Sequence, residues 1–326
     1  MRRPGGRTTG RRVLRIAVLA LLALLACGAL LRGPAISFDR AGSPTELYAR
    51  WQPPRNMPRQ GSVELLTGAR RIPSTAGFAP RDASLYLPPA ARVPNPPALP
   101  LIVFMMGQPG DPDPGPLRTA LDELAAQHGG LAPIALVVDQ LGSPDDNPAC
   151  VDSAAYGGVQ TYVTRDVVEW ARTNLHVEPS PAFWTIGGFS NGGGCALDWG
   201  LERPGLWGAI VSISGESYQG TEFPDQVLQQ VFDGDAAAYA AAKPAAQVAH
   251  YPGAYSGHVA LFAAGSQDEF FTAQVDLSAD LTRQAGLATT VFSIPGKDHV
   301  GALPEGLRET LGALYPHLGL APPPRR

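Results

Sequence analysis

FWTIGGFSNGGG, at residues 183–194, is the strongest indication of the fold in this sequence. Its first residues form an apolar run rich in strand-forming side chains, and its last glycines open a helical pattern that ends near Arg203. Between the two, Ser190 is flanked at a distance of two residues by Gly188 and Gly192. Glycines at these positions leave room for a tight turn in which the serine backbone is strained. The stretch therefore predicts a strand, a sharp turn that carries Ser190, and a helix.

The helix expected to begin at Asn191 would bring a free backbone N–H and the positive end of a helix dipole close to the Ser190 oxygen. Gly193 and Gly194 would let this helix pack closely on the sheet. A serine placed in this way is a candidate nucleophile, which needs a base and an acid from elsewhere in the chain.

Short apolar runs alternate with helical patterns on both sides of this stretch. The expected strands are 62–66, 83–87, 101–106, 134–139, 182–187, 208–214, 259–264 and 289–294. The expected helices include 116–128, 159–175, an Ala-rich stretch at 235–249, and 303–314. The first two strands suggest a hairpin-like start, and the later alternation indicates βαβ units. We predict an α/β fold with a mainly parallel central sheet flanked by helices, in one catalytic domain at 61–318.

The charge distribution separates the N-terminus from the rest of the chain. Six arginines and no acid occur within residues 1–15, although the net charge of the 326 residues is −4. Without those arginines, nineteen basic and 29 acidic residues remain, which is a net charge of −10. A body this acidic argues against a nucleic-acid partner, whose phosphates need clustered Lys or Arg. No spaced His/Cys metal signature occurs, and the acids Asp111, Asp113, Asp145 and Asp146, beside Pro and Gly, favour turns over a calcium site.

The base and the acid that Ser190 requires are expected after it in the chain, each in a loop that follows a strand. Asp268 follows the strand 259–264 and His299 follows the strand 289–294, so these two residues complete a Ser-Asp-His set. Glu269 is the main rival for the acid. Asp298 is next to His299 in sequence and is poorly placed to reach its ring.

The second oxyanion donor is expected from the loop after the strand 101–106, which contains Gly107, Gln108, Pro109 and Gly110. Proline has no N–H to donate. The backbone N–H of Gln108 is therefore the expected partner of the Asn191 N–H in an oxyanion hole.

An export signal is predicted at the N-terminus, where the basic leader precedes sixteen apolar residues at 16–31. An uncleaved membrane anchor, a lipoprotein modified at Cys27 and simple secretion are all compatible with this pattern. Residues 1–31 are thus a leader with an anchor helix, 32–60 a Pro/Arg-rich tether, and 319–326 a tail. The catalytic domain is expected outside the cell, attached to the membrane through its N-terminal segment. Because an exported body meets an oxidising environment, a Cys150–Cys195 disulfide is a further hypothesis.

The chain resembles the putative-esterase family of α/β hydrolases over roughly residues 60–318, in the branch of esterase D (S-formylglutathione hydrolase) and the secreted mycolyltransferases. The resemblance is carried by LIVFMMGQPG at 101–110, TYVTRDVV at 161–168, IGGFSNGG at 186–193 and the loops of Asp268 and His299. It implies an α/β-hydrolase fold with Ser190 as nucleophile, Asp268 as acid, His299 as base, and the Gln108 and Asn191 N–H groups as the oxyanion hole. One departure is Met106 before Gly107, where many relatives have His-Gly.

These features together predict an exported serine hydrolase that cleaves carboxylic esters or thioesters of small molecules, lipids or glycans. The alternatives are an acyltransferase acting on a cell-envelope glycan and a non-catalytic envelope protein that retains a hydrolase scaffold. No cofactor is implied, because Ser-His-Asp chemistry requires none. Residues 216–257, which contain several aromatic side chains, either line the pocket or serve ordinary packing.

Overall fold

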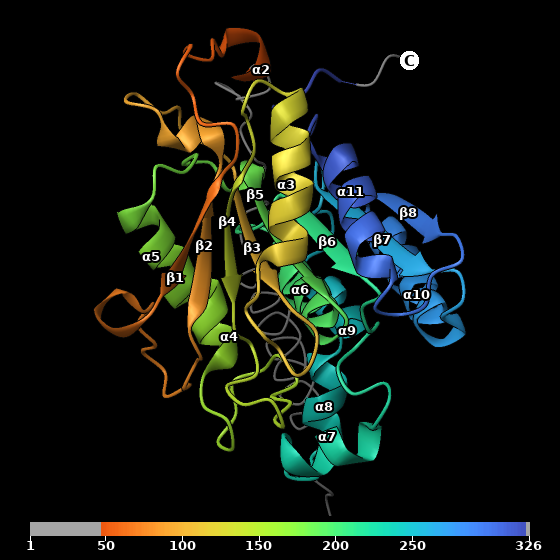
Figure 1. Cartoon of the computed structure of the whole chain (residues 1–326). Helices are drawn as coiled ribbons and strands as arrows, with labels where there is room; N and C mark the ends of the chain where they lie inside the picture. Colours follow the sequence, from red (N-terminus) through yellow and green to blue (C-terminus); the bar gives the residue numbers. More distant parts are fainter. Residues whose placement is uncertain (1–46, 324–326) are drawn as a thin grey trace, which may run out of the picture. The chain divides into compact units, whose positions relative to one another are not determined.

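The computed structural model describes residues 47–323, and within them eight strands form one sheet in the order β1-β2-β4-β3-β5-β6-β7-β8 (Figure 1). The strands are β1 (Ser62–Leu66), β2 (Ala83–Leu87), β3 (Leu101–Met105), β4 (Ile134–Val138), β5 (Trp184–Phe189), β6 (Ala209–Ile213), β7 (Val259–Gly265) and β8 (Ala288–Ile294). β1 pairs with β2, and β2 with β4, in antiparallel fashion. The remaining neighbours in the sheet, β4–β3, β3–β5, β5–β6, β6–β7 and β7–β8, are all parallel pairs. The predicted mainly parallel sheet with an antiparallel start is confirmed.

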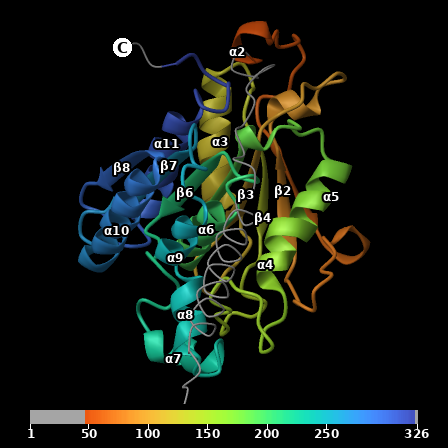
Figure 2. The same cartoon turned by 180° about the vertical axis from the view of Figure 1, so that it is seen from behind.

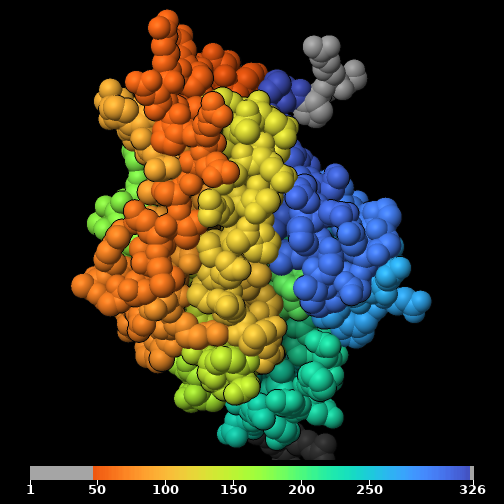
Figure 3. Space-filling model, viewed as in Figure 1, coloured from red at the N-terminus to blue at the C-terminus, as the bar shows by residue number. Residues whose placement is uncertain are grey.

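Helices flank both faces of the sheet. The α-helices are α2 (Leu47–Arg50), α3 (Gly115–Gln127), α4 (Val159–Thr161), α5 (Val167–Asn174), α6 (Asn191–Glu202), α7 (Pro224–Gln230), α8 (Ala236–Ala242), α9 (Pro244–His250), α10 (Glu269–Ala285) and α11 (Ala302–Leu314). Short 3₁₀ turns occur at Gly68–Arg70, Pro89–Arg92 and Pro181–Phe183. α3 and α11 cover the front face in Figure 1 and pack on each other, and α5, α6 and α10 lie on the opposite face (Figure 2). In the space-filling view, α3 (yellow) fills the front face between β1 and β2 (orange) and α11 (blue) (Figure 3).

The central strands are buried on both faces because helices cover both sides of the sheet. Every residue of β3, β4, β5 and β6 is buried. This explains why their sequences are continuous apolar runs without the alternation of a half-exposed strand.

Three predicted elements differ from the structure by more than one residue. β5 begins two residues later than expected, because residues 181–183 form a 3₁₀ turn. The helix predicted at 159–175 is divided by a π-helical segment, Tyr162–Asp166. The Ala-rich stretch forms two helices, because Pro244 cannot continue α8 and instead begins α9.

The folded body takes in residues from both of its predicted flanks. Within the segment assigned to a tether, Leu47 is buried, the Tyr48 N–H donates to the Gly319 carbonyl (3.2 Å), and Trp51 Nε1 donates to the Gly129 carbonyl (2.7 Å). Leu320, in the predicted tail, is also buried. The apolar side chains at these two ends thus pack on the body. The leader, the predicted anchor at 16–31 and Cys27 lie outside the described residues, and none of the helices in residues 47–323 is long and apolar enough to cross a membrane.

The long connection between β6 and β7 forms an insert, residues 216–257, that contains α7, α8 and α9 (teal in Figure 1). Val227 and Tyr239 of this insert form a small hydrophobic cluster with Ala149, separate from the main core. Part of the insert therefore packs locally, against the loop that follows β4.

Candidate active site

The turn between β5 and α6 holds Ser190 in a strained conformation, with φ 54° and ψ −122°. A Cβ atom at Gly188 would lie 2.2 Å from the Gly192 backbone, and one at Gly192 would lie 2.3 Å from the Met105 carbonyl oxygen. These two positions accept only glycine, because the obstructing atoms are backbone atoms that cannot move aside. The Ser190 N–H donates to the Ile213 carbonyl (2.9 Å), which ties the turn to the neighbouring strand β6.

Ser190, His299 and Asp268 form a continuous hydrogen-bonded chain. His299 Nε2 lies 2.9 Å from Ser190 Oγ, and His299 Nδ1 lies 2.9 Å from Asp268 Oδ2. Ser190 follows β5, Asp268 follows β7 and His299 follows β8, so all three lie at the carboxyl edge of the parallel sheet. Asp268 also begins α10, where its Oδ1 accepts from the Phe271 N–H (3.2 Å).

The surroundings of His299 fix the plane of its ring. The ring centroid lies 4.0 Å from that of Phe271 and 4.9 Å from that of Phe189. Both phenylalanines are largely buried, whereas the His299 side chain keeps 29% of its area exposed. The imidazole is therefore held by apolar contacts and remains accessible to a substrate.

The two rival acids do not bond to His299. Asp298 Oδ1 accepts from the Gly301 N–H (2.8 Å) and so stabilises the turn before α11. Glu269 is exposed in the first turn of α10. The geometry brings Asp268, and neither of these neighbours, to the imidazole.

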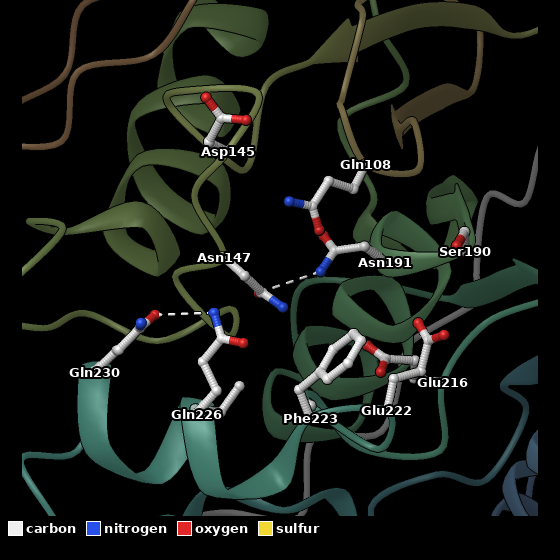
Figure 4. A pocket seen from close by; sticks show the side chains of 12 residues that line it. Gln108, Asp145, Asn147, Ser190, Asn191, Glu216, Glu222, Phe223, Gln226 and Gln230 are labelled. Carbon is white, nitrogen blue, oxygen red and sulfur yellow. Dashed lines mark hydrogen bonds between the residues drawn. The ribbon is translucent and has the colours of Figure 1, made fainter.

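A cavity of about 180 Å³ opens beside Ser190 (Figure 4). Its lining comes from the loops after β3 and β4, the start of α6, and the insert. The lining residues are Gln108, Asp145, Asn147, Ser190, Asn191, Glu216, Gly220, Glu222, Phe223, Gln226, Val227 and Gln230. Gln108 and Asn191 thus lie at the same cavity as Ser190, and the insert lines the pocket, as one of the two readings of its sequence suggested.

Gln140, which no sequence motif marks, connects the segments that carry Gln108 and Asn191. Its Nε2 donates to the Met106 carbonyl (2.7 Å) and to Asn191 Oδ1 (3.0 Å), and its side chain is buried. The Asn191 Nδ2 in turn donates to Asn147 Oδ1 (3.2 Å). The only signal in the sequence was the place of Gln140 in the loop directly after β4.

A disulfide joins Cys150 to Cys195. Cys150 belongs to the loop after β4, which also carries Asn147, and Cys195 lies in α6, five residues after Ser190. The Cys150 carbonyl accepts from Trp199 Nε1 (2.7 Å), a second link between this loop and α6. The loop that lines the cavity is therefore fastened covalently to the helix that begins at the serine.

Two acidic side chains are buried, that of Asp198 within α6 and that of Glu216 at the start of the insert. Burial raises the pKa of Asp198 well above its ordinary value, and the charges of Glu216 and Glu202 add to the effect. Burial, chiefly, and the charge of Glu222 also raise the pKa of Glu216, although hydrogen bonds from Thr221 oppose the shift. Removing these carboxyl groups from water favours their neutral forms.

The acids considered for a calcium site do not assemble into one. Among the residues that the structure describes, no group of three or more His, Cys, Asp or Glu side chains is arranged to hold a metal ion. Asp113 accepts from the Gly115 N–H (2.9 Å) at the start of α3, as a turn-forming residue does.

Comparison with known proteins places the fold and the family. An S-formylglutathione hydrolase from Agrobacterium tumefaciens has a similar structure, with a TM-score of 0.61 and 16% identity, over 81% of this chain and 96% of that one. A ferulic acid esterase also gives a TM-score of 0.61, with 14% identity, over 79% of this chain and 99% of the esterase. Both likenesses show the α/β-hydrolase fold.

The sequence itself has a closer relative. An uncharacterized protein of Corynebacterium glutamicum is 32% identical over 309 residues, which cover 88% of this chain and 72% of the relative. Residues 78–302 match the family described as Putative esterase, and this range contains the β5 turn and the loops of Asp268 and His299. The chain belongs to the family described as Putative esterase.

Proposed function

We propose that the chain is a serine hydrolase that cleaves carboxylic esters or thioesters. One observation carries the proposal: the Ser190-His299-Asp268 chain of 2.9 Å hydrogen bonds, at the edge of a cavity and on a strained turn. A nucleophile bonded to a base, which is bonded in turn to an orienting acid, is the arrangement that covalent acyl transfer requires.

In the proposed mechanism, Ser190 Oγ attacks the carbonyl carbon of the substrate while His299 Nε2 accepts the hydroxyl proton. Asp268 holds the Nδ1 side of the ring and stabilises the imidazolium that forms. His299 then gives the proton to the leaving alcohol or thiol. Water, activated by the same imidazole, attacks the acyl-enzyme and releases the acid.

The backbone N–H groups of Gln108 and Asn191 are the proposed oxyanion donors. Their support is the position of both residues at the cavity beside Ser190, and the place of Asn191 at the N-terminus of α6. Donors fixed in a folded backbone stabilise the developing negative charge without reorganising during the reaction.

Replacing Ser190 tests the proposal. We expect Ser190→Ala to abolish covalent labelling by a fluorophosphonate probe and to lower kcat for p-nitrophenyl acetate by at least ~10³-fold. Ser62→Ala is the matched control and should label like the native chain, because β1 lies at an edge of the sheet and is separated from β5 by β2, β4 and β3. Undiminished labelling of Ser190→Ala would contradict the assignment, and a native chain that neither labels nor turns over esters would favour the non-catalytic alternative.

A second candidate is transfer of the acyl group to a hydroxyl acceptor on a cell-envelope glycan. The cavity favours it because five of its lining residues carry carboxamide side chains, which can donate to and accept from sugar hydroxyls. They are Gln108, Asn147, Asn191, Gln226 and Gln230. Product analysis with and without a sugar acceptor separates the two reactions. A new sugar ester would indicate a transferase, and free acid alone a hydrolase.

We also infer that the catalytic body is exported and attached to the membrane by its N-terminal segment. The basic leader with its apolar run and the Cys150–Cys195 disulfide support this, because disulfides persist in oxidising compartments. Protease added to intact cells should digest the body. If a radiolabelled fatty acid is incorporated into the native chain but not into Cys27→Ala, the protein is a lipoprotein. If the chain stays in the membrane without incorporating the label, it has an uncleaved anchor.

A further inference from the structure

The cavity beside Ser190 is lined by acids without a basic partner. Its twelve lining residues include Asp145 from the loop after β4, and Glu216 and Glu222 from the insert, but no Lys, Arg or His. Three acidic residues therefore line one small volume, and no basic residue lines it.

These carboxyl groups are also absent from the ion pairs that the described part of the chain forms. Glu216 is buried, and its Oε1 accepts only neutral donors, the Thr221 N–H (3.1 Å) and the Thr221 hydroxyl (2.8 Å). The charge of Glu222 contributes to the raised pKa of Glu216. A concave wall of one sign concentrates ions of the opposite sign.

Phe223 adds a second feature suited to a cation. Its side chain is 65% exposed, which is unusual for a large apolar residue, and it lines the cavity. Figure 4 shows its ring beside the side chains of Glu216 and Glu222. The face of an aromatic ring attracts ammonium groups, most strongly where water is partly excluded.

We propose that the part of the substrate that fills this cavity carries a positively charged ammonium group. The inference rests on the proposed function, since it describes the substrate of the same serine. Glu222 and Phe223 would hold the ammonium group, whose positive charge would favour the ionised form of the neighbouring Glu216. Asp145 would add its charge from the opposite loop. Substrates with an anionic group at this position would be repelled.

The ammonium group keeps its charge and takes no part in bond making. In the acylation step the Ser190 Oγ–acyl bond forms, the bond from the acyl carbon to the leaving sulfur or oxygen breaks, and the leaving group takes the proton from His299. The ammonium contacts act before this step, by fixing where the scissile carbonyl lies relative to Ser190.

Three thioesters of one acyl group test the proposal with the full chain. Acetylthiocholine is cationic, S-(3,3-dimethylbutyl) thioacetate is its neutral isostere, and S-acetyl-3-mercaptopropanesulfonate is anionic. Release of the thiol gives kcat/KM for each. We expect the cationic thioester to exceed the neutral one by about tenfold, from charge attraction and cation–π contact, with the anionic thioester slowest. The preference should weaken with added NaCl, since salt screens the exposed carboxylates.

Glu222→Gln shows whether these residues cause the preference. Glu222 is exposed, so the substitution leaves packing intact while it removes one charge. The ratio of kcat/KM for the cationic thioester to that for the neutral one should fall about threefold. Glu169→Gln, the same change on the exposed side of α5, is the matched control and should leave the ratio unaltered.

The outcomes separate this inference from the proposed function. Hydrolysis of all three thioesters at equal rates, or a preference unaltered in Glu222→Gln, would overturn the cationic substrate while leaving the serine hydrolase in place. A chain that hydrolyses none of them, and that also fails to react with the fluorophosphonate, would overturn the proposed function itself.

Discussion

Gln140 joins two segments that the proposed mechanism needs at a fixed separation. The Gln140 side-chain amide donates to the carbonyl of Met106 and to the side chain of Asn191. Met106 lies two residues before Gln108, and Asn191 directly follows Ser190. A small displacement of either segment would move an N–H away from the developing oxyanion, where its strength depends on distance. Gln140 is thus a positioning residue that need not touch the substrate.

Replacing Gln140 should lower turnover more than binding. Gln140→Met keeps the length of the side chain but removes both hydrogen bonds, and we expect kcat for p-nitrophenyl acetate to fall about tenfold with little change in KM, because oxyanion stabilisation acts in the transition state. Steady-state kinetics measure the split, and affinity for a boronic acid should fall in parallel. Gln127→Met, exposed in α3, is the control. An increase in KM at constant kcat would contradict this role.

The residues predicted from the sequence and those missed differ in how local their signal is. Ser190 lies within a motif of five residues, and Asp268 and His299 follow apolar runs in a fixed order, so all three could be located from the sequence. Gln140 acts only because β4 lies beside β3 in the sheet, which brings the loop after β4 to Met106 and Asn191. Such a contact depends on strand order, which residue types alone do not encode.

Among the elements, α6 follows the strained backbone of Ser190 and contains a buried acidic side chain, Asp198. Asp198 lies in its middle turn, and the Oδ1 of this buried residue has no hydrogen-bond partner in the described part of the chain. Because the pKa of Asp198 is raised in the folded state, its contribution to stability is present below the unfolded pKa and is lost as pH rises through the folded pKa. α6 should therefore destabilise the fold increasingly toward neutral pH.

Asp198→Asn should reverse this loss. The free energies of unfolding of the variant and of the native chain should differ least near pH 4. The advantage of the variant should then grow by about 1.4 kcal/mol for each pH unit between the unfolded and the folded pKa of Asp198. Urea denaturation at several pH values measures the difference. Asp276→Asn, on the exposed side of α10, controls for the loss of one carboxyl group. A difference that does not grow with pH would contradict the assignment.

At the scale of the whole molecule, the disulfide fastens two distant parts of the fold. Cys150 and Cys195 are 45 residues apart in sequence, and the segment between them contains α4, α5 and β5. Closing a loop of this length restricts the unfolded chain and stabilises the native state by about 4 kcal/mol in the chain-entropy model.

The double variant Cys150→Ala/Cys195→Ala should therefore lower the free energy of unfolding by about 4 kcal/mol. Urea titration of the oxidised native chain and of the variant gives the difference, and the native chain with its disulfide reduced is a control for the two substitutions. If the double variant and the reduced native chain both unfold at the same urea concentration as the oxidised native chain, the disulfide does not constrain the unfolded state.

Most of the fold could be predicted because the core strands are buried on both faces and form continuous apolar runs. β3, β4 and β6 were located to within one residue at each end. The packing of Leu47 and Trp51 could not be predicted, because two isolated apolar residues in a Pro/Arg-rich stretch form no periodic pattern. The polar character of the cavity could not be predicted, since its lining comes from four separate segments.

The insert at 216–257 packs part of its apolar surface into a cluster of its own, with Val227 and Tyr239, separate from the main core. It also supplies seven of the twelve residues that line the cavity, including Glu216, Glu222 and Phe223. Substitutions there can change which substrates fit without disturbing the sheet that holds Ser190, Asp268 and His299 in place. Evolution can therefore diversify specificity in this segment at little cost to folding, and the insert is the natural place to redirect the enzyme by design.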